Sequence, residues 1–289
     1  MVDEFRVDWR RAQDALRTEV SRVTALLRSV RDPGAPAVGE WNLAEVAMHL
    51  SQAWVVVPGL ARDDLSGAYE VLPDLGGTAG ESLITDLWDL GGVTVDAVRA
   101  DAERDPRVLA DRIEVRAQEF FDECEGRSPD EPHPWLVQGI TVPLSTLTCH
   151  LLNETLMHGG DMAHADRRSW PMDRGHATLV LLGFLLPVLT ALDPRALVDP
   201  VKAAGLRATY EVRLRGGGRF RLAFDHGALR VEGASSRPVD CYLSADPVAL
   251  LQVMWGRQSQ WTAVATGKLL AWGRRPWLGP KLRTVMRNP

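Results

Sequence analysis

The sequence predicts an α+β fold, in which a four-helix bundle is followed by a small α+β domain with an antiparallel sheet. Apolar residues recur at helical spacing through most of residues 5–164. Between residues 206 and 231 they alternate or form short runs, as they do in strands. The polar loop DRRSWPMDRG at 166–175 separates the two patterns, and a chain of 289 residues has the size at which one core usually divides into two. We therefore expect one domain at 1–168 and a second at 174–289.

Five helices are predicted in the first domain, and four of them form the bundle. The first ends at the helix breaker DPG at 32–34. The second begins after Asn42, a residue suited to capping a helix, and ends before Pro58. The Gly-containing segment 60–80 shows little periodicity and is a candidate lid or pocket wall. The expected helices are 5–30, 43–57, 81–103, 106–124 and 144–164.

The second domain combines strands with helices. Short apolar segments around GGG and DHG turns predict a meander of antiparallel strands at 206–214, 219–224 and 229–231. The apolar run 177–192 is shorter than the roughly 20 residues of a membrane helix, so we expect a buried helix. The tail at 247–286 is predicted to be helical.

Composition excludes several classes of protein. A net charge of -5 and a pI near 5.8 argue against a nucleic-acid partner, which would require a dense basic patch. The charged, amphipathic N-terminus lacks the apolar stretch of a secretory signal, and no membrane segment is predicted. The three cysteines are odd in number and form no CxxC pair, which indicates a reducing compartment. We expect a cytoplasmic protein, either a monomer or a small homo-oligomer.

Three polar residues could bind a metal ion. Glu154 and His158 in the segment ETLMHGGD lie four residues apart on a predicted helix, so both side chains project from one face. His49 lies in the middle of another predicted helix and supplies the third ligand. One carboxylate and two imidazoles leave coordination positions open, which is typical of a catalytic divalent ion such as Zn²⁺.

Two alternatives compete with this site. Glu154 and His158 taken alone could be an ordinary surface pair on a helix. His150 is a rival third ligand, but residues on three consecutive turns of a straight helix diverge by about 5 to 6 Å per turn, too far for one small ion. Asp161, one turn after His158, could accept a hydrogen bond from that imidazole.

These residues carry a resemblance to a known family. The segment WNLAEVAMH, which contains His49, followed by the distant ExxxHxxD at 154–161, resembles the mycothiol-dependent maleylpyruvate isomerase family of the DinB-like superfamily. The resemblance covers about residues 5–165. It implies a DinB-like bundle whose two histidines and glutamate bind a divalent metal, usually zinc. It also implies mycothiol, a low-molecular-weight thiol, as cosubstrate.

The C-terminal part is similar to the companion domain of these enzymes, which resembles sterol carrier proteins. The similarity rests on SADPVALLQVMWGR at 244–257 and on the later GKLLAWG. It implies that Arg257 helps to bind an anionic substrate, although such an arginine could equally be a surface residue that caps a helix. The chain departs from the family at Gly160, where an aromatic residue is common, and in the long segments 57–80 and 105–140. A substrate other than maleylpyruvate is therefore expected.

The expected function is that of a metal-dependent thiol S-transferase. A thiol with a pKa near 8.5 is only slightly ionised at neutral pH, and coordination to a divalent cation deprotonates it. The thiolate would attack a small electrophile or exchange with another thiol, in biosynthesis or detoxification. Three alternatives stay open: a thiol-dependent cis-trans isomerase, a metal-dependent hydrolase, and a non-enzymatic module that binds an apolar ligand.

Overall fold

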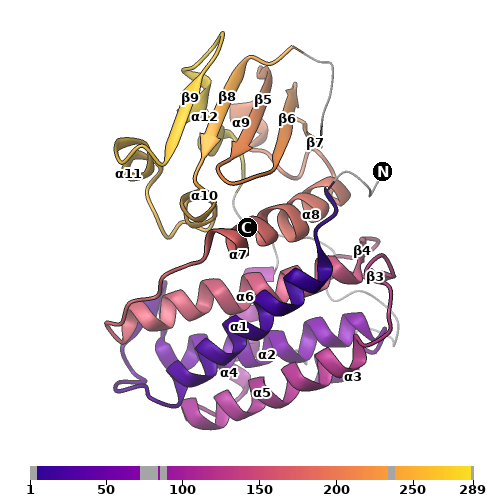
Figure 1. Cartoon of the computed structure of the whole chain (residues 1–289), viewed down its shortest axis with the longest axis vertical. Helices are drawn as coiled ribbons and strands as arrows, with labels where there is room; N and C mark the ends of the chain where they lie inside the picture. The colour runs from indigo at the N-terminus through magenta and orange to yellow at the C-terminus, as the bar shows by residue number, and fades with distance from the viewer. Residues whose placement is uncertain (1–4, 72–83, 85–89, 234–237, 288–289) are drawn as a thin grey trace. The chain divides into compact units, whose positions relative to one another are not determined.

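The chain folds into two compact units in the computed structural model (Figure 1). Residues 8–171 form the first unit, which we call the bundle domain. Residues 172–289, together with residues 1–7, form the second unit, the C-terminal domain. The residues that the structure describes are 5–71, 84, 90–233 and 238–287.

Helices dominate the bundle domain. Their bounds are Trp9–Leu27 (α1), Leu43–Ala61 (α2), Ser66–Val71 (α3), Leu90–Ala100 (α4), Pro106–Glu123 (α5) and Leu144–Ala165 (α6). Helices α1 and α2 each pack against both α5 and α6, and this arrangement makes the four-helix bundle that the sequence predicts (Figure 1). The shorter α3 and α4 pack on α2. Large apolar side chains such as Trp54, Phe120 and Leu144 are fully buried in the core.

Two small antiparallel hairpins lead into the central helices. Strands Pro36–Val38 (β1) and Trp41–Asn42 (β2) precede α2, and strands Pro132–Pro134 (β3) and Thr141–Pro143 (β4) precede α6. The expected cap is present at Asn42, whose side chain accepts a hydrogen bond from the backbone N–H of Glu45 while the Glu45 carboxylate accepts one from the N–H of Asn42. This capping box sets where α2 begins.

The end predicted for α2 is wrong. The helix continues through Pro58 to Ala61, and Val56, Val57, Leu60 and Ala61 are buried. Proline removes a single backbone hydrogen bond from the helix, and burial of this apolar turn outweighs that loss.

The segment between α2 and α5 contains more helix than its composition predicts. Helix α3 lies inside the predicted loop 60–80, of which residues 72–80 fall outside the described residues. The predicted helix 81–103 is observed as α4, while residues 81–83 and 85–89 also fall outside the described part. The lid therefore stays a prediction.

The C-terminal domain is built on a five-stranded sheet. Its strands are Arg207–Leu214 (β5), Arg219–Asp225 (β6), Leu229–Glu232 (β7), Cys241–Ala245 (β8) and Leu269–Trp272 (β9). The order across the sheet is β7-β6-β5-β8-β9, with β9 at one edge. The three predicted strands, β5 to β7, form an antiparallel meander.

The other half of the sheet corrects the sequence prediction. Strand β8 was not expected, and it pairs with β5 in parallel, so the sheet is mixed and only mainly antiparallel. The tail is not continuously helical, because β9 pairs with β8 between short helices. These helices are Pro247–Met254 (α10), Gln260–Ala265 (α11) and Leu278–Val285 (α12). A four-residue run such as LLAW is too short to show a period, so only pairing with β8 defines it as a strand.

The predicted apolar helix is observed as one continuous segment, 174–191. It consists of Arg174–Val180 (α7), a π-helical turn at Leu181–Leu185 (η4) and Leu186–Ala191 (α8). This segment and Leu43–Ala61 are the two described helices long and apolar enough to cross a membrane. In α2 most of the apolar window, 78%, is buried within the protein, as in the core helix of a bundle.

A cavity of about 400 Å³ lies within the C-terminal domain. Apolar side chains of η4 and α8, of the sheet and of α10 to α12 line it. The described helix Pro200–Ala203 (α9) completes the domain.

Candidate metal centre

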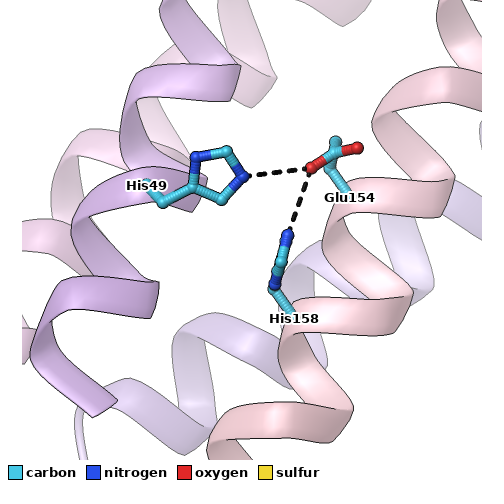
Figure 2. Close-up of side chains that lie close together, drawn as sticks. All are labelled: His49, Glu154 and His158. Carbon is cyan, nitrogen blue, oxygen red and sulfur yellow. Dashed lines mark ion pairs between the residues drawn. The ribbon is translucent and has the colours of Figure 1, made fainter. Parts of the chain in front are cut away.

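Three side chains converge between two helices of the bundle domain. His49 projects from α2, and Glu154 and His158 project from α6 toward it (Figure 2). The distance from Glu154 Oε2 to His49 Nε2 is 3.4 Å, and from the same oxygen to His158 Nε2 it is 3.3 Å. Each of the three residues offers one candidate ligand atom, and these three atoms all lie within 4.8 Å of one another. The side chains are only 13 to 18% exposed.

Helix geometry and helix packing place these groups together. Glu154 and His158 are one turn apart on α6 and therefore share a face. Helix α2 packs directly against α6, and His49 lies near the middle of α2 on the face toward α6. The structure thus brings together all three residues that the sequence singled out.

The donor set fits a divalent metal. Around a tetrahedral ion with bonds of about 2.0 to 2.1 Å, neighbouring donor atoms are roughly 3.4 Å apart, which matches the spacing of Glu154 Oε2 from each imidazole. Two imidazole nitrogens and one carboxylate oxygen suit Zn²⁺ and similar ions. Three protein ligands would leave at least one position for another molecule.

The two oxygens of Glu154 have different partners. Oε2 faces His49 and His158, whereas Oε1 lies 3.2 Å from Asn153 Nδ2 and 3.5 Å from His150 Nε2. His150 therefore approaches the opposite oxygen of the carboxylate and lies outside the three-residue cluster. The sequence reasoning did not identify Asn153. A polar residue on a largely buried helix, beside a candidate ligand, was the available signal.

Asp161 orients one of the imidazoles. Its Oδ2 lies 3.2 Å from His158 Nδ1, and its side chain is buried. A proton on Nδ1 would be donated to this carboxylate, which directs the lone pair of Nε2 toward Glu154 and the site of a metal. This is the arrangement that the spacing of His158 and Asp161 suggested.

The charges of the metal-free cluster follow from burial and hydrogen bonding. Burial favours a raised pKa for Glu154, but the hydrogen bonds with His150, His158 and His49 outweigh it and hold that pKa well below its usual range. Burial lowers the pKa of His49. Burial acts in the same direction on His158, but hydrogen bonds with Asp161 and Glu154 reverse it and raise its pKa to about 9. At neutral pH the cluster therefore holds an ionised Glu154, a neutral His49 and a protonated His158.

Two tryptophan rings lie beside the histidines of this region. The Trp41 ring centroid lies 5.3 Å from that of His49, and the rings of His49 and His158 meet edge to face at 4.7 Å. The ring centroids of Trp135 and His150 are 6.1 Å apart. These ring contacts limit the rotation of the imidazoles.

Arg257 belongs to the C-terminal domain and is exposed just after α10. Its Nη1 donates a hydrogen bond of 2.7 Å to the carbonyl of Trp255 at the end of that helix. The side chain thus has the position of a helix cap, one of the two roles considered from the sequence. Its role toward a substrate stays a prediction.

Among the solved structures that resemble the chain are the mycothiol-dependent maleylpyruvate isomerase and a histidine-to-alanine variant of it. Each has a TM-score of 0.52 and 12% sequence identity, over 92% of this chain and 93% of that chain. The chain has the fold of this isomerase. Residues 190–273 also match the model of the SCP-2 sterol transfer family.

These findings confirm the fold expected from the sequence motifs. The chain shares the isomerase's architecture of a helical bundle and a C-terminal α+β domain, and the latter is sterol-carrier-like. No curated protein matches the sequence. At 12% identity the likeness to the isomerase concerns the fold alone.

Proposed function

We propose that this protein is a metal-dependent thiol S-transferase that uses mycothiol or a related low-molecular-weight thiol. The observation that carries the proposal is the convergence of His49, Glu154 and His158 in a nearly buried site. The shared fold with an enzyme described as mycothiol-dependent supports the choice of thiol.

The chain's own residues would hold the metal and control protons around it. His49 Nε2, Glu154 Oε2 and His158 Nε2 are the ligand atoms, and Asp161 holds the proton on His158 Nδ1. A divalent cation bound here would lower the pKa of a thiol that enters an open position and so supply a thiolate at neutral pH. Asn153 and His150 hold the second oxygen of Glu154, which keeps the first one directed at the metal position.

The reaction would join the thiol sulfur to an electrophilic carbon of a small molecule. A carbon–sulfur bond forms while a leaving group departs, or while a double bond or epoxide opens and takes up a proton. If the adduct instead rotates and expels the thiol, the same first step gives a cis-trans isomerase. The chain differs from the pattern of the maleylpyruvate isomerase family at Gly160 and in the segments 57–80 and 105–140. These differences favour transfer to another electrophile, or thiol exchange, over the maleylpyruvate reaction.

A second candidate function is binding of an apolar ligand by the C-terminal domain. The cavity of about 400 Å³ has the volume of a small-molecule site, and the match to the SCP-2 sterol transfer family covers most of its walls. This function is compatible with the enzyme, because the cavity and the metal cluster lie in different domains.

Replacing the native metal by Co²⁺ tests the transferase directly. We expect mycothiol to produce a sulfur-to-cobalt charge-transfer band, because its thiolate would enter an open coordination position. Methanol at the same concentration serves as the control for a hydroxyl ligand. An unchanged spectrum at saturating thiol would favour the hydrolase, and absence of bound metal would leave only the apolar-ligand module.

A further inference from the structure

Helix α2 carries a buried amide one turn beyond the candidate ligand His49. Gln52 follows His49 by three residues, so the two side chains leave neighbouring positions on one side of the helix. Gln52 is buried, and its Nε2 donates a hydrogen bond of 2.9 Å to the carbonyl oxygen of Ala97 in α4. Because a carbonyl oxygen can only accept, this bond fixes which end of the amide is nitrogen. The amide oxygen, Oε1, is therefore left for another partner.

This oxygen has no hydrogen-bond partner in the described part of the chain. Gln52 Oε1 is buried, and a buried acceptor without a partner destabilises the folded protein. Asn153, next to Glu154, repeats the pattern. Its Nδ2 lies 3.2 Å from Glu154 Oε1, while its Oδ1 is buried and likewise lacks a partner among the described residues. Two amide oxygens near the candidate metal ligands are thus available to hydrogen-bond donors of a bound molecule.

The position of Gln52 favours the thiol as the molecule that supplies the donor. Residues three apart on a helix have Cβ atoms about 5 to 6 Å apart, so a thiol that enters beside His49 brings the atoms next to its sulfur toward Gln52. A neutral acceptor in a buried place suits a neutral N–H better than an ammonium, because a buried charge needs an opposite charge beside it. Amides of cysteine carry such an N–H two carbons from the sulfur.

We propose that Gln52 Oε1 accepts a hydrogen bond from an amide N–H of the cosubstrate and thereby selects thiols that carry this group close to the sulfur. The inference rests on the proposed thiol S-transferase and names the residue that distinguishes one thiol from another. Because Oε1 is buried in the free protein, the side chains that cover it must shift when the thiol binds, as side chains commonly do at binding sites. A thiol of the same shape without the N–H leaves this acceptor unpaired and binds more weakly.

Two thiols of nearly equal shape test the proposal on the full-length protein loaded with Co²⁺. N-acetylcysteamine has an amide N–H two carbons from its sulfur, and 2-mercaptoethyl acetate has an ester oxygen in that place. We expect both to produce the sulfur-to-cobalt band, with a Kd for the amide that is lower by at least about tenfold. In Gln52→Met the two Kd values should become nearly equal through weaker binding of the amide, while folding and metal content stay unchanged.

The matched control changes an exposed glutamine of the same domain. Gln118 on α5 donates a hydrogen bond to Asp122 at the surface, so Gln118→Met should keep the preference for the amide. Clear bands with equal Kd values for both thiols in the wild type would overturn the inference and leave the transferase in place. Absence of a band with either thiol would overturn both. A preference that survives in Gln52→Met and disappears in Asn153→Leu would overturn the assignment to Gln52 and move the contact to Asn153 Oδ1.

Discussion

At the scale of single residues, the metal centre depends on how each imidazole and carboxylate is held. Glu154 presents Oε2 to His49 and His158 because His150 and Asn153 engage Oε1. This separates residues that would touch a metal from residues that orient a ligand. Removal of a ligand and removal of its support should therefore have different effects.

Substitution of the ligands tests the proposed site. We expect the purified protein to contain about one divalent metal per chain, preferentially zinc. His49→Ala and His158→Ala should each lose most of it, because two remaining donors hold an ion weakly. His150→Ala should retain its metal, since that imidazole approaches Oε1 of Glu154 and not the oxygen that faces His49 and His158. Metal content after dialysis is the measurement, and full metal in both ligand variants would contradict the site.

The raised pKa of His158 has a consequence for metal-free protein. Its folded-state pKa of about 9 exceeds the ordinary 6.5, so the stabilising contribution of its proton is complete below pH 6.5 and is lost as the pH rises toward 9. Between these pH values His49 stays neutral and Glu154 stays ionised, because the pKa values of both groups are lowered. We expect the free energy of unfolding to fall by at most about 3 kcal/mol between these pH values.

Metal binding should show the opposite dependence. His158 must lose its proton to become a ligand, so metal affinity should increase from pH 6.5 to 9, with about one proton released per ion. Urea denaturation of metal-free protein and calorimetry in buffers of different ionisation enthalpy measure the two effects. In His158→Gln the pH dependence of unfolding should largely disappear, and its persistence would assign it to another group.

At the scale of elements, the ends of helices place the functional side chains. The capping box at Asn42 and Glu45 begins α2 two turns before His49, and the β3–β4 hairpin leads directly into α6. Close packing near the end of α6 also restricts the sequence. A Cβ added at Gly159 would lie 2.5 Å from the ring of Trp170, so only glycine fits there without displacing that ring.

Arg257, just after α10, is the candidate clamp for an anionic substrate. A guanidinium can hold a carboxylate through two parallel hydrogen bonds. We expect Arg257→Ala to leave metal content and folding intact and to lower kcat/KM by on the order of tenfold to a thousandfold. Arg257→Lys keeps the charge without the paired geometry and should recover only part of the loss. Turnover like that of the wild type in Arg257→Ala would leave this residue with its structural role as a cap on the Trp255 carbonyl.

At the scale of the whole molecule, the two domains differ in chemistry. The bundle domain contains all three proposed ligands, and the C-terminal domain contains the apolar cavity. This division indicates that metal binding and apolar-ligand binding can be separated experimentally.

Truncation after Pro171 tests that separation. The fragment 1–171 retains the complete bundle, so we expect it to bind metal with the stoichiometry of the full chain. We expect catalysis to be lost, because the fragment lacks Arg257, the residue proposed to bind the substrate. Circular dichroism confirms that the fragment is folded before its metal is measured. A folded fragment without metal would show that the C-terminal domain contributes to the site.

The sequence by itself determined the features that depend on local geometry. A spacing of four residues places Glu154 and His158 on one helix face, Asn42 is a suitable cap, and the turns around β5 to β7 predict a meander. These signals need only the period of a helix or strand, so they can be identified without knowing what packs against them. The family motifs likewise predicted a fold that structural comparison confirmed.

Only the tertiary structure decided the features that join distant segments. His49 meets Glu154 because α2 packs against α6, although the two residues are more than a hundred positions apart. Strands β8 and β9 likewise became strands only through pairing across the sheet. Helix Leu43–Ala61 passes Pro58 because the surrounding core buries that turn. In each case the deciding free energy comes from contacts between segments, which no local pattern of residues records.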